Sequence, residues 1–191
     1  YAPHCYPYDT HEGQGYTTTS KSQLKDWERE RNKETKFHGN TPLLTGEFGL
    51  SPSQAGFADY LTDFNAMSDR NQWHWAYWSN DLGGWGPLNP NRTETAILPH
   101  LIRTYPKATA GKIKSFSYDV NSKIFTMTFT SNTAISKPTE IFVPNRFYTS
   151  GWDLSVAGTT KYTQTTDAIK QTLLFSTTDN NKEITITITP K

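Results

Sequence analysis

The stretch "TPLLTGEFGL", residues 41–50, places a carboxylate, Glu47, between two glycines at the end of an apolar run. A charge in this position has two interpretations. Glu47 is either a structural acid whose oxygens are hydrogen-bonded to nearby backbone, or a catalytic carboxylate. The spacing alone leaves both interpretations open.

Three further side chains could join Glu47 at one end of a sheet. Side chains alternate between the two faces of a strand, so His4 and Tyr6 would point one way and Cys5 the other. Trp78 ends a later apolar run. If the strands that contain these residues are parallel neighbours, one opening at their carboxyl ends would be surrounded by four side chains, those of Glu47, His4, Tyr6 and Trp78. His4 and Tyr6 could equally be ordinary core polar groups, because buried imidazole and phenol groups often only need a partner.

A glycine-rich segment, "DLGGWG", places Trp85 in a predicted loop over residues 80–91. A tryptophan in such a loop has little core to fill and offers a flat apolar face, which suits stacking on a sugar or an acyl chain. Trp73 and Trp75, by contrast, are expected to pack in the core. Trp85 is therefore a candidate substrate contact.

Other chemistries find little support in the sequence. There is no Cys/His metal spacing, phosphate-cradling glycine loop, dinucleotide fingerprint or G-x-S-x-G elbow, so we expect no metal and no other cofactor. The net charge is +1 without a basic block, so nucleic acid is not an expected partner. The one cysteine, Cys5, cannot form an internal disulfide and is expected to be a buried, inert thiol. Asn91 begins an N-x-T sequon and is a candidate glycosylation site if the protein is secreted.

Residues 1–106 alternate between short apolar runs and helical patterns. The pattern predicts strands over Tyr1–Tyr6, Leu43–Glu47 and Gln72–Trp78, and helices over Ser20–Phe37, Pro52–Ser68 (capped by Ser51) and Glu94–Tyr105. Three repeats of strand and helix indicate a parallel α/β arrangement. They cannot close a sheet, whereas a (β/α)8 TIM barrel takes about 250 residues. We therefore expect the last three units of such a barrel, with five units upstream of this chain.

Residues 107–191 are rich in threonine and β-branched residues. In "KIFTMTFT", Phe125, Met127 and Phe129 face one way and the threonines the other, and "EITITIT" repeats this alternation. Six short strands separated by turn residues predict an antiparallel β-sandwich domain. The expected fold class is thus α/β followed by all-β.

With these residues identified, the sequence resembles glycoside hydrolase family 5, and within it the endoglycoceramidase-like branch. The motif "APHCY" resembles the sixth barrel strand of the family, "PLLTGEFG" the seventh and "WHWAYWSNDLGGWG" the eighth. The segment "LIRTYPKATAGK" resembles the exit from the barrel in this branch, and "TEIFVPNRFY" and "ITITITP" its C-terminal β-sandwich. The resemblance covers essentially the whole chain.

The resemblance implies a retaining glycosidase with two carboxyl groups about 5–5.5 Å apart. Glu47 would be the nucleophile, Tyr6 would orient it, His4 would lie near the leaving group, and Trp78 would stack beneath the sugar. The acid/base glutamate of the family lies on the fourth strand, outside this chain, and Glu12 is its one local substitute. We therefore expect the chain alone to be inactive, and its partner to be the N-terminal chain of the same precursor.

The resemblance implies a substrate in which a β-linked glycan is attached to ceramide. Related activities on glucosylceramide, steryl glucosides or polysaccharide stay open, as does a non-catalytic fragment that binds glycan or glycolipid. A structural interpretation, in which the sandwich braces the barrel, is also possible. The resemblance further implies a secreted or lysosomal protein, with possible peripheral contact with membrane lipid.

Overall fold

The computed structural model describes residues 1–191 and divides into two compact units, Tyr1–Leu101 and Ile102–Lys191. The division falls before the boundary predicted at residue 106. Thr104 contributes to this difference because its hydroxyl lies 2.8 Å from that of Tyr148, far along the second unit. Residues next to the predicted boundary also form a strand that pairs within the second unit.

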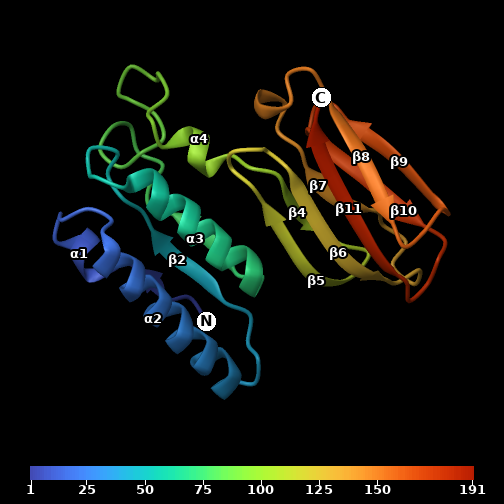
Figure 1. Cartoon of the computed structure of the whole chain (residues 1–191), viewed down its shortest axis with the longest axis horizontal. Coiled ribbons are helices and arrows are strands. Elements are labelled where there is room, and N and C mark those ends of the chain that lie inside the picture. The colour runs from blue at the N-terminus through green and yellow to red at the C-terminus, as the bar shows by residue number, and fades with distance from the viewer. The chain divides into compact units, whose positions relative to one another are not determined.

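The first unit repeats the order of strand and helix, as predicted (Figure 1). Its three strands form one parallel sheet in the order β1-β2-β3. The elements are β1 (His4–Cys5), α1 (Tyr8–His11), α2 (Thr18–Phe37), β2 (Leu44–Phe48), α3 (Phe57–Asn71), β3 (His74–Tyr77) and α4 (Leu98–Leu101).

The start of α3 differs from the prediction. The expected cap at Ser51 instead closes a turn, in which the Gln54 N–H donates to the Ser51 carbonyl at 3.0 Å. The helix begins only at Phe57, after Gly56. Gly56 has a φ of 75°, and a Cβ there would lie 2.6 Å from the Tyr16 carbonyl oxygen, so glycine is required. A tight contact with a distant segment thus sets this helix start.

The helix predicted over Glu94–Tyr105 is wrong in extent, because α4 spans only Leu98–Leu101. Glu94 forms an isolated bridge with Leu88, and the Thr95 N–H donates to the Pro87 carbonyl at 2.9 Å. These bonds hold the segment extended against the preceding loop. Pro106, predicted to stop the helix, lies within a strand.

Helices α2 and α3 cover one face of the parallel sheet (Figure 1). Phe48 of β2 is fully buried there and stacks on Phe64 of α3, with ring centroids 3.6 Å apart. On the other face, Leu44 is 43% exposed and Trp78 50% exposed, and His4 and His74 are exposed as well. The sheet therefore buries one face and leaves the other open within this chain.

The second unit contains two four-stranded antiparallel sheets, which confirms the predicted sandwich (Figure 1). Phe125, Met127 and Phe129 face its core, as expected, and pair with a strand whose isoleucines are equally buried. The sheet orders are β4-β7-β10-β9 and β5-β6-β11-β8. The strands are β4 (Tyr105–Ala108), β5 (Gly111–Tyr118), β6 (Phe125–Ser131), β7 (Thr139–Phe142), β8 (Trp152–Ala157), β9 (Tyr162–Asp167), β10 (Thr172–Thr177) and β11 (Glu183–Pro190).

Two of these eight strands, β4 and β9, were not among the six predicted. β4 contains Pro106, which resembles a helix stop and is tolerated here because β4 lies at a sheet edge. β9 is also an edge strand, and almost all of its residues are exposed. Such a strand shows no alternation of apolar and polar residues, so its sequence gives no period-two signal.

Candidate active site

Glu47 lies at the carboxyl end of β2, beside the first strand. The parallel register pairs Glu47 with His4 and Phe48 with Cys5. The His4 Nδ1 atom is 3.3 Å from Glu47 Oε2, and the Tyr6 hydroxyl donates to the same oxygen at 3.3 Å. The structure thus brings these three predicted residues together through one carboxylate oxygen.

The second oxygen of Glu47, Oε1, has no hydrogen-bond partner within the chain, and the side chain is 29% exposed on the open face of the sheet. Burial raises the pKa of the Tyr6 phenol well above its ordinary value, and the negative charge of Glu47 raises it further. Tyr6 therefore remains a neutral donor at physiological pH. One oxygen is oriented by neighbours and the other is available to react.

A β-bulge in β2 determines where Glu47 points. The register with β3 pairs Thr45 with Trp75 and Phe48 with Tyr77, so three steps along β2 match two along β3. Thr45 and Phe48 are both fully buried, although strict alternation would place residues three apart on opposite faces. The extra residue turns Glu47 away from the helices, toward His4. Bulges commonly re-aim side chains beside active sites.

Two tryptophans flank this cluster. Trp78 follows β3, and its N–H donates to the Phe48 carbonyl at 2.8 Å, which fixes it next to the end of β2. The Trp78–Ser79 peptide bond is cis. Trp85 is partly buried, and its ring centroid lies 6.1 Å from that of Tyr6. Both predicted tryptophans therefore lie beside the Glu47 cluster.

Tyr77 supports the site and was missed in the sequence analysis. Its hydroxyl donates to the Trp85 carbonyl at 2.8 Å, which ties the glycine-rich loop to β3. Its ring packs edge-on against Phe48 at 5.4 Å. The alternation along β3 places Tyr77 on the helix-covered face, a position typical of packing residues. The hydrogen bond to the Trp85 carbonyl becomes visible only in the folded loop.

The other candidate residues lie elsewhere. Glu12 is exposed at the C-cap of α1, and no hydrogen bond or ion pair joins its side chain to Glu47. Trp73 and Trp75 pack in or against the core, and Cys5 is a buried free thiol. Asn91 is exposed in a loop, where its Oδ1 accepts from the Thr93 hydroxyl at 2.7 Å.

The structure contains no group of three or more His, Cys, Asp or Glu side chains that could hold a metal ion. None of its helices combines the length and apolar character needed to cross a membrane.

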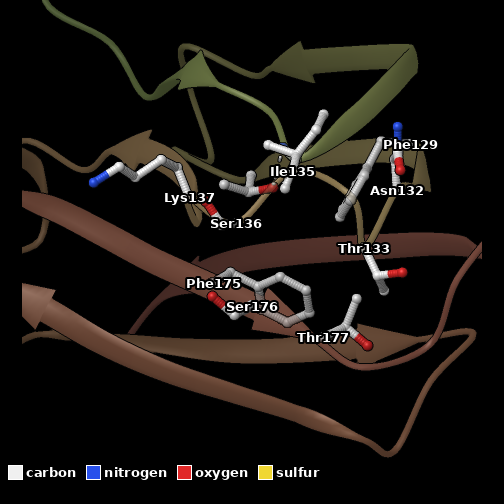
Figure 2. Close-up of a pocket in the computed structure, with 11 residues that line it drawn as sticks. Phe129, Asn132, Thr133, Ile135, Ser136, Lys137, Phe175, Ser176 and Thr177 are labelled. Carbon is white, nitrogen blue, oxygen red and sulfur yellow. Dashed lines mark hydrogen bonds between the residues drawn. The ribbon is translucent and has the colours of Figure 1, made fainter.

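A cavity of about 190 Å³ lies in the second unit (Figure 2). Phe129 and Phe175 border it, and the polar groups around it are hydroxyls, the amide of Asn132 and the ammonium of Lys137, which extends away from it (Figure 2). No carboxylate or imidazole lines this cavity. The Glu47 cluster therefore has the groups needed for acid–base or nucleophilic chemistry, and this cavity does not.

Comparison with known proteins agrees with the resemblance seen in the sequence. Residues 103–189 match the model of the glycoside hydrolase family 5 C-terminal domain. This match spans nearly all of the second unit. Endoglycoceramidase I of Rhodococcus hoagii (strain 103S) is 33% identical over 119 residues, 62% of this chain and 22% of that protein. An endoglycoceramidase of Hydra vulgaris is 32% identical over 82 residues, 36% of this chain and 16% of that protein.

The similarity to solved structures extends over both units. Endo-glycoceramidase II from Rhodococcus sp., in its ganglioside GM3 complex, covers 100% of this chain with a TM-score of 0.89 and 28% identity. The resemblance to the endoglycoceramidase branch of family 5 is therefore confirmed, as is the fold class. This chain spans 22% of the Rhodococcus hoagii relative and 42% of the solved chain. Cryptococcus neoformans sterylglucosidase 1, at 16% identity and a TM-score of 0.65, shares the fold.

Proposed function

We propose that this chain provides the nucleophile, Glu47, of a retaining glycosidase that cleaves the β-glycosidic bond between glycan and ceramide in glycosphingolipids. The similarity to endoglycoceramidases supports the class of reaction and substrate. The observation that argues most for Glu47 is the convergence of His4 and Tyr6 on Oε2, each at 3.3 Å, while Oε1 stays free.

The chemistry follows from this arrangement. Glu47 Oε1 would attack the anomeric carbon, and the bond from that carbon to the leaving oxygen would break. A second carboxyl group must donate a proton to the leaving oxygen. The resulting glycosyl ester of Glu47 is then hydrolysed by water, which gives its proton to that second group and frees Glu47. The Tyr6 hydroxyl would orient Glu47 in both steps.

We assign the second carboxyl group to a segment outside this chain, because Glu12, the one local candidate, is exposed at the C-cap of α1 and has no hydrogen bond or ion pair with Glu47. Parallel sheets are normally covered on both faces, whereas this sheet leaves one face open and ends in two edge strands, β1 and β3. We propose that an N-terminal part of the same precursor adds five βα units, completes the barrel and supplies the acid/base glutamate. Without it, general acid catalysis, worth about 10²–10⁴-fold, would be lost.

Trp78 and Trp85 are the proposed binding surfaces of this half of the site. Trp78 is half exposed and would stack beneath the sugar at the cleaved bond, and Trp85 would contact sugar or lipid. A ceramide substrate would also bring the protein into peripheral contact with membrane lipid. The exposed Asn91 would be glycosylated if the protein is secreted or lysosomal.

The decisive experiment uses the complete protein, with both halves of the barrel, and a panel of glycosphingolipids, glucosylceramide, steryl glucosides and cello-oligosaccharides. Glu47→Gln is expected to abolish hydrolysis and retain glycolipid binding, whereas Glu12→Gln, a change at an exposed acid, is expected to leave both unchanged. Hydrolysis by the Glu47→Gln variant would reject the nucleophile. Glycolipid binding without cleavage by the unaltered complete protein would indicate a binding module instead.

Two further measurements test the same proposal. A 2-fluoro glycoside with a good leaving group should add its mass to the peptide that contains Glu47, because the deglycosylation step is slowed. This chain alone should cleave none of the substrates until the N-terminal part is added. Turnover by this chain alone would contradict the two-part site.

A further inference from the structure

Gly46, the residue before Glu47, is not explained by its backbone conformation. It lies within β2 and is not among the glycines with positive φ, so an alanine could adopt the same backbone. A glycine inside a strand weakens that strand, and it commonly marks a bulge or a close approach by another group. Gly46 is part of the bulge that turns Glu47 toward His4.

The group that approaches Gly46 is the His4 imidazole. A Cβ atom at Gly46 would lie 3.2 Å from His4 Cδ2 and 3.3 Å from His4 Nε2. Both distances are tighter than ordinary van der Waals contact, so the ring would have to shift by a few tenths of an ångström. The ring thus occupies the space that a side chain at position 46 would need.

The same ring reaches Glu47 through its other nitrogen. His4 Nδ1 lies 3.3 Å from Glu47 Oε2, already beyond the usual length of an N–H···O hydrogen bond. The backbone of His4 is fixed, because its carbonyl accepts from Trp27 Nε1 at 3.0 Å and its Cα pairs in register with Glu47. Any displacement of the ring must therefore come from the side-chain torsions of His4, which also set the distance from Nδ1 to Glu47.

We propose that Gly46 is a positioning residue of this site: its missing side chain holds the His4 imidazole within reach of Glu47. The effect of Gly46 on turnover rests on the proposed function, whereas its effect on the distance between His4 and Glu47 does not. Gly49, which follows Glu47 by two residues, is required for a different reason from Gly46. A Cβ there would lie 2.3 Å from the Trp78 carbonyl oxygen, a clash with backbone that concerns folding.

The kinetic test is Gly46→Ala in the complete protein. We expect kcat to fall about tenfold, since small misplacements of catalytic groups are costly, while KM changes less than twofold. The unfolding temperature should not fall, because alanine restricts the unfolded chain. In a His4→Ala background, Gly46→Ala should change kcat less than twofold, because the two changes act through one contact. Independent, multiplying losses would overturn the proposal.

The geometry can be tested in the complete protein without a measurement of activity, which separates the positioning role from the proposed function. The ¹⁵N chemical shift of His4 Nδ1 should change in Gly46→Ala in the same direction as in Glu47→Gln. An unchanged shift in Gly46→Ala would overturn the positioning role, whatever the activity of Glu47→Gln. If Gly46→Ala alone does not fold, the double variant with His4→Ala, which removes the opposing ring, should fold. Its failure to fold would also overturn the proposal.

Discussion

The Tyr6 hydroxyl and the Glu47 carboxylate, 41 residues apart in the sequence, meet at 3.3 Å on the open face of the parallel sheet. His4 shares the same carboxylate oxygen. The three groups come from the carboxyl ends of two neighbouring parallel strands, where the fold gathers polar side chains from separate segments.

Tyr6→Phe removes the hydroxyl and keeps the ring. Loss of a hydrogen bond to a charged group typically costs about 1.5–3 kcal/mol when that bond is buried. Because this bond is long and partly exposed, we expect a loss at the lower end, about tenfold in kcat. Steady-state hydrolysis by the complete protein measures it. Tyr8→Phe is the matched control, since Tyr8 is 66% exposed, and equal rates for the two variants would contradict a role for Tyr6.

Tyr60 provides a prediction about alkaline stability. It is fully buried, and its hydroxyl donates to the Cys5 carbonyl at 2.8 Å. Burial raises the pKa of its phenol well above the ordinary value, and burial does the same for Tyr16 and Tyr77. The folded state therefore keeps phenolic protons that the unfolded state loses near pH 10. The free energy of unfolding should be at its full value below about pH 10 and fall as the pH rises further.

Tyr60→Phe should show two effects in denaturant unfolding at pH 7 and pH 10.5. At pH 7 the variant should be less stable by about 1–3 kcal/mol, because the Cys5 carbonyl loses its donor. The loss of stability between the two pH values should be smaller than in the unaltered chain. An unchanged difference between the two pH values would show that this phenol is not a source of the alkaline sensitivity.

The stacked pair of Phe48 and Phe64 supports the strand that presents Glu47. Phe64→Ala should lower the free energy of unfolding of the first unit by about 3–5 kcal/mol, because both rings are fully buried. Phe37→Ala is the control, since Phe37 is 85% exposed, and should change it by less than about 0.5 kcal/mol. Residue-resolved hydrogen exchange separates the first unit from the second. Similar effects for the two variants would contradict this assignment of the core.

Local periodicity in the sequence was sufficient to predict several features of the fold. Alternation predicted that Phe125, Met127 and Phe129 face the sandwich core, and the repeated strands and helices predicted a parallel sheet. It also placed His4 and Cys5 on opposite faces of one strand, with Cys5 buried beneath the helices. A period of two in the sequence shows which face of the sheet each side chain occupies, because successive side chains in a strand point to opposite faces.

The contacts between those elements depend on the three-dimensional fold. The bulge between Thr45 and Phe48 breaks the period and turns Glu47 toward His4, and it becomes visible only in the register with β3. Trp85 lies beside Tyr6 because the Tyr77 hydroxyl donates a hydrogen bond to the Trp85 carbonyl. The residues in such contacts are distant in the sequence, and a local pattern of apolar and polar residues carries no information about how distant residues pack together. The apolar run ending in Glu47 therefore marked a candidate, and the cross-strand pairing placed it in a site.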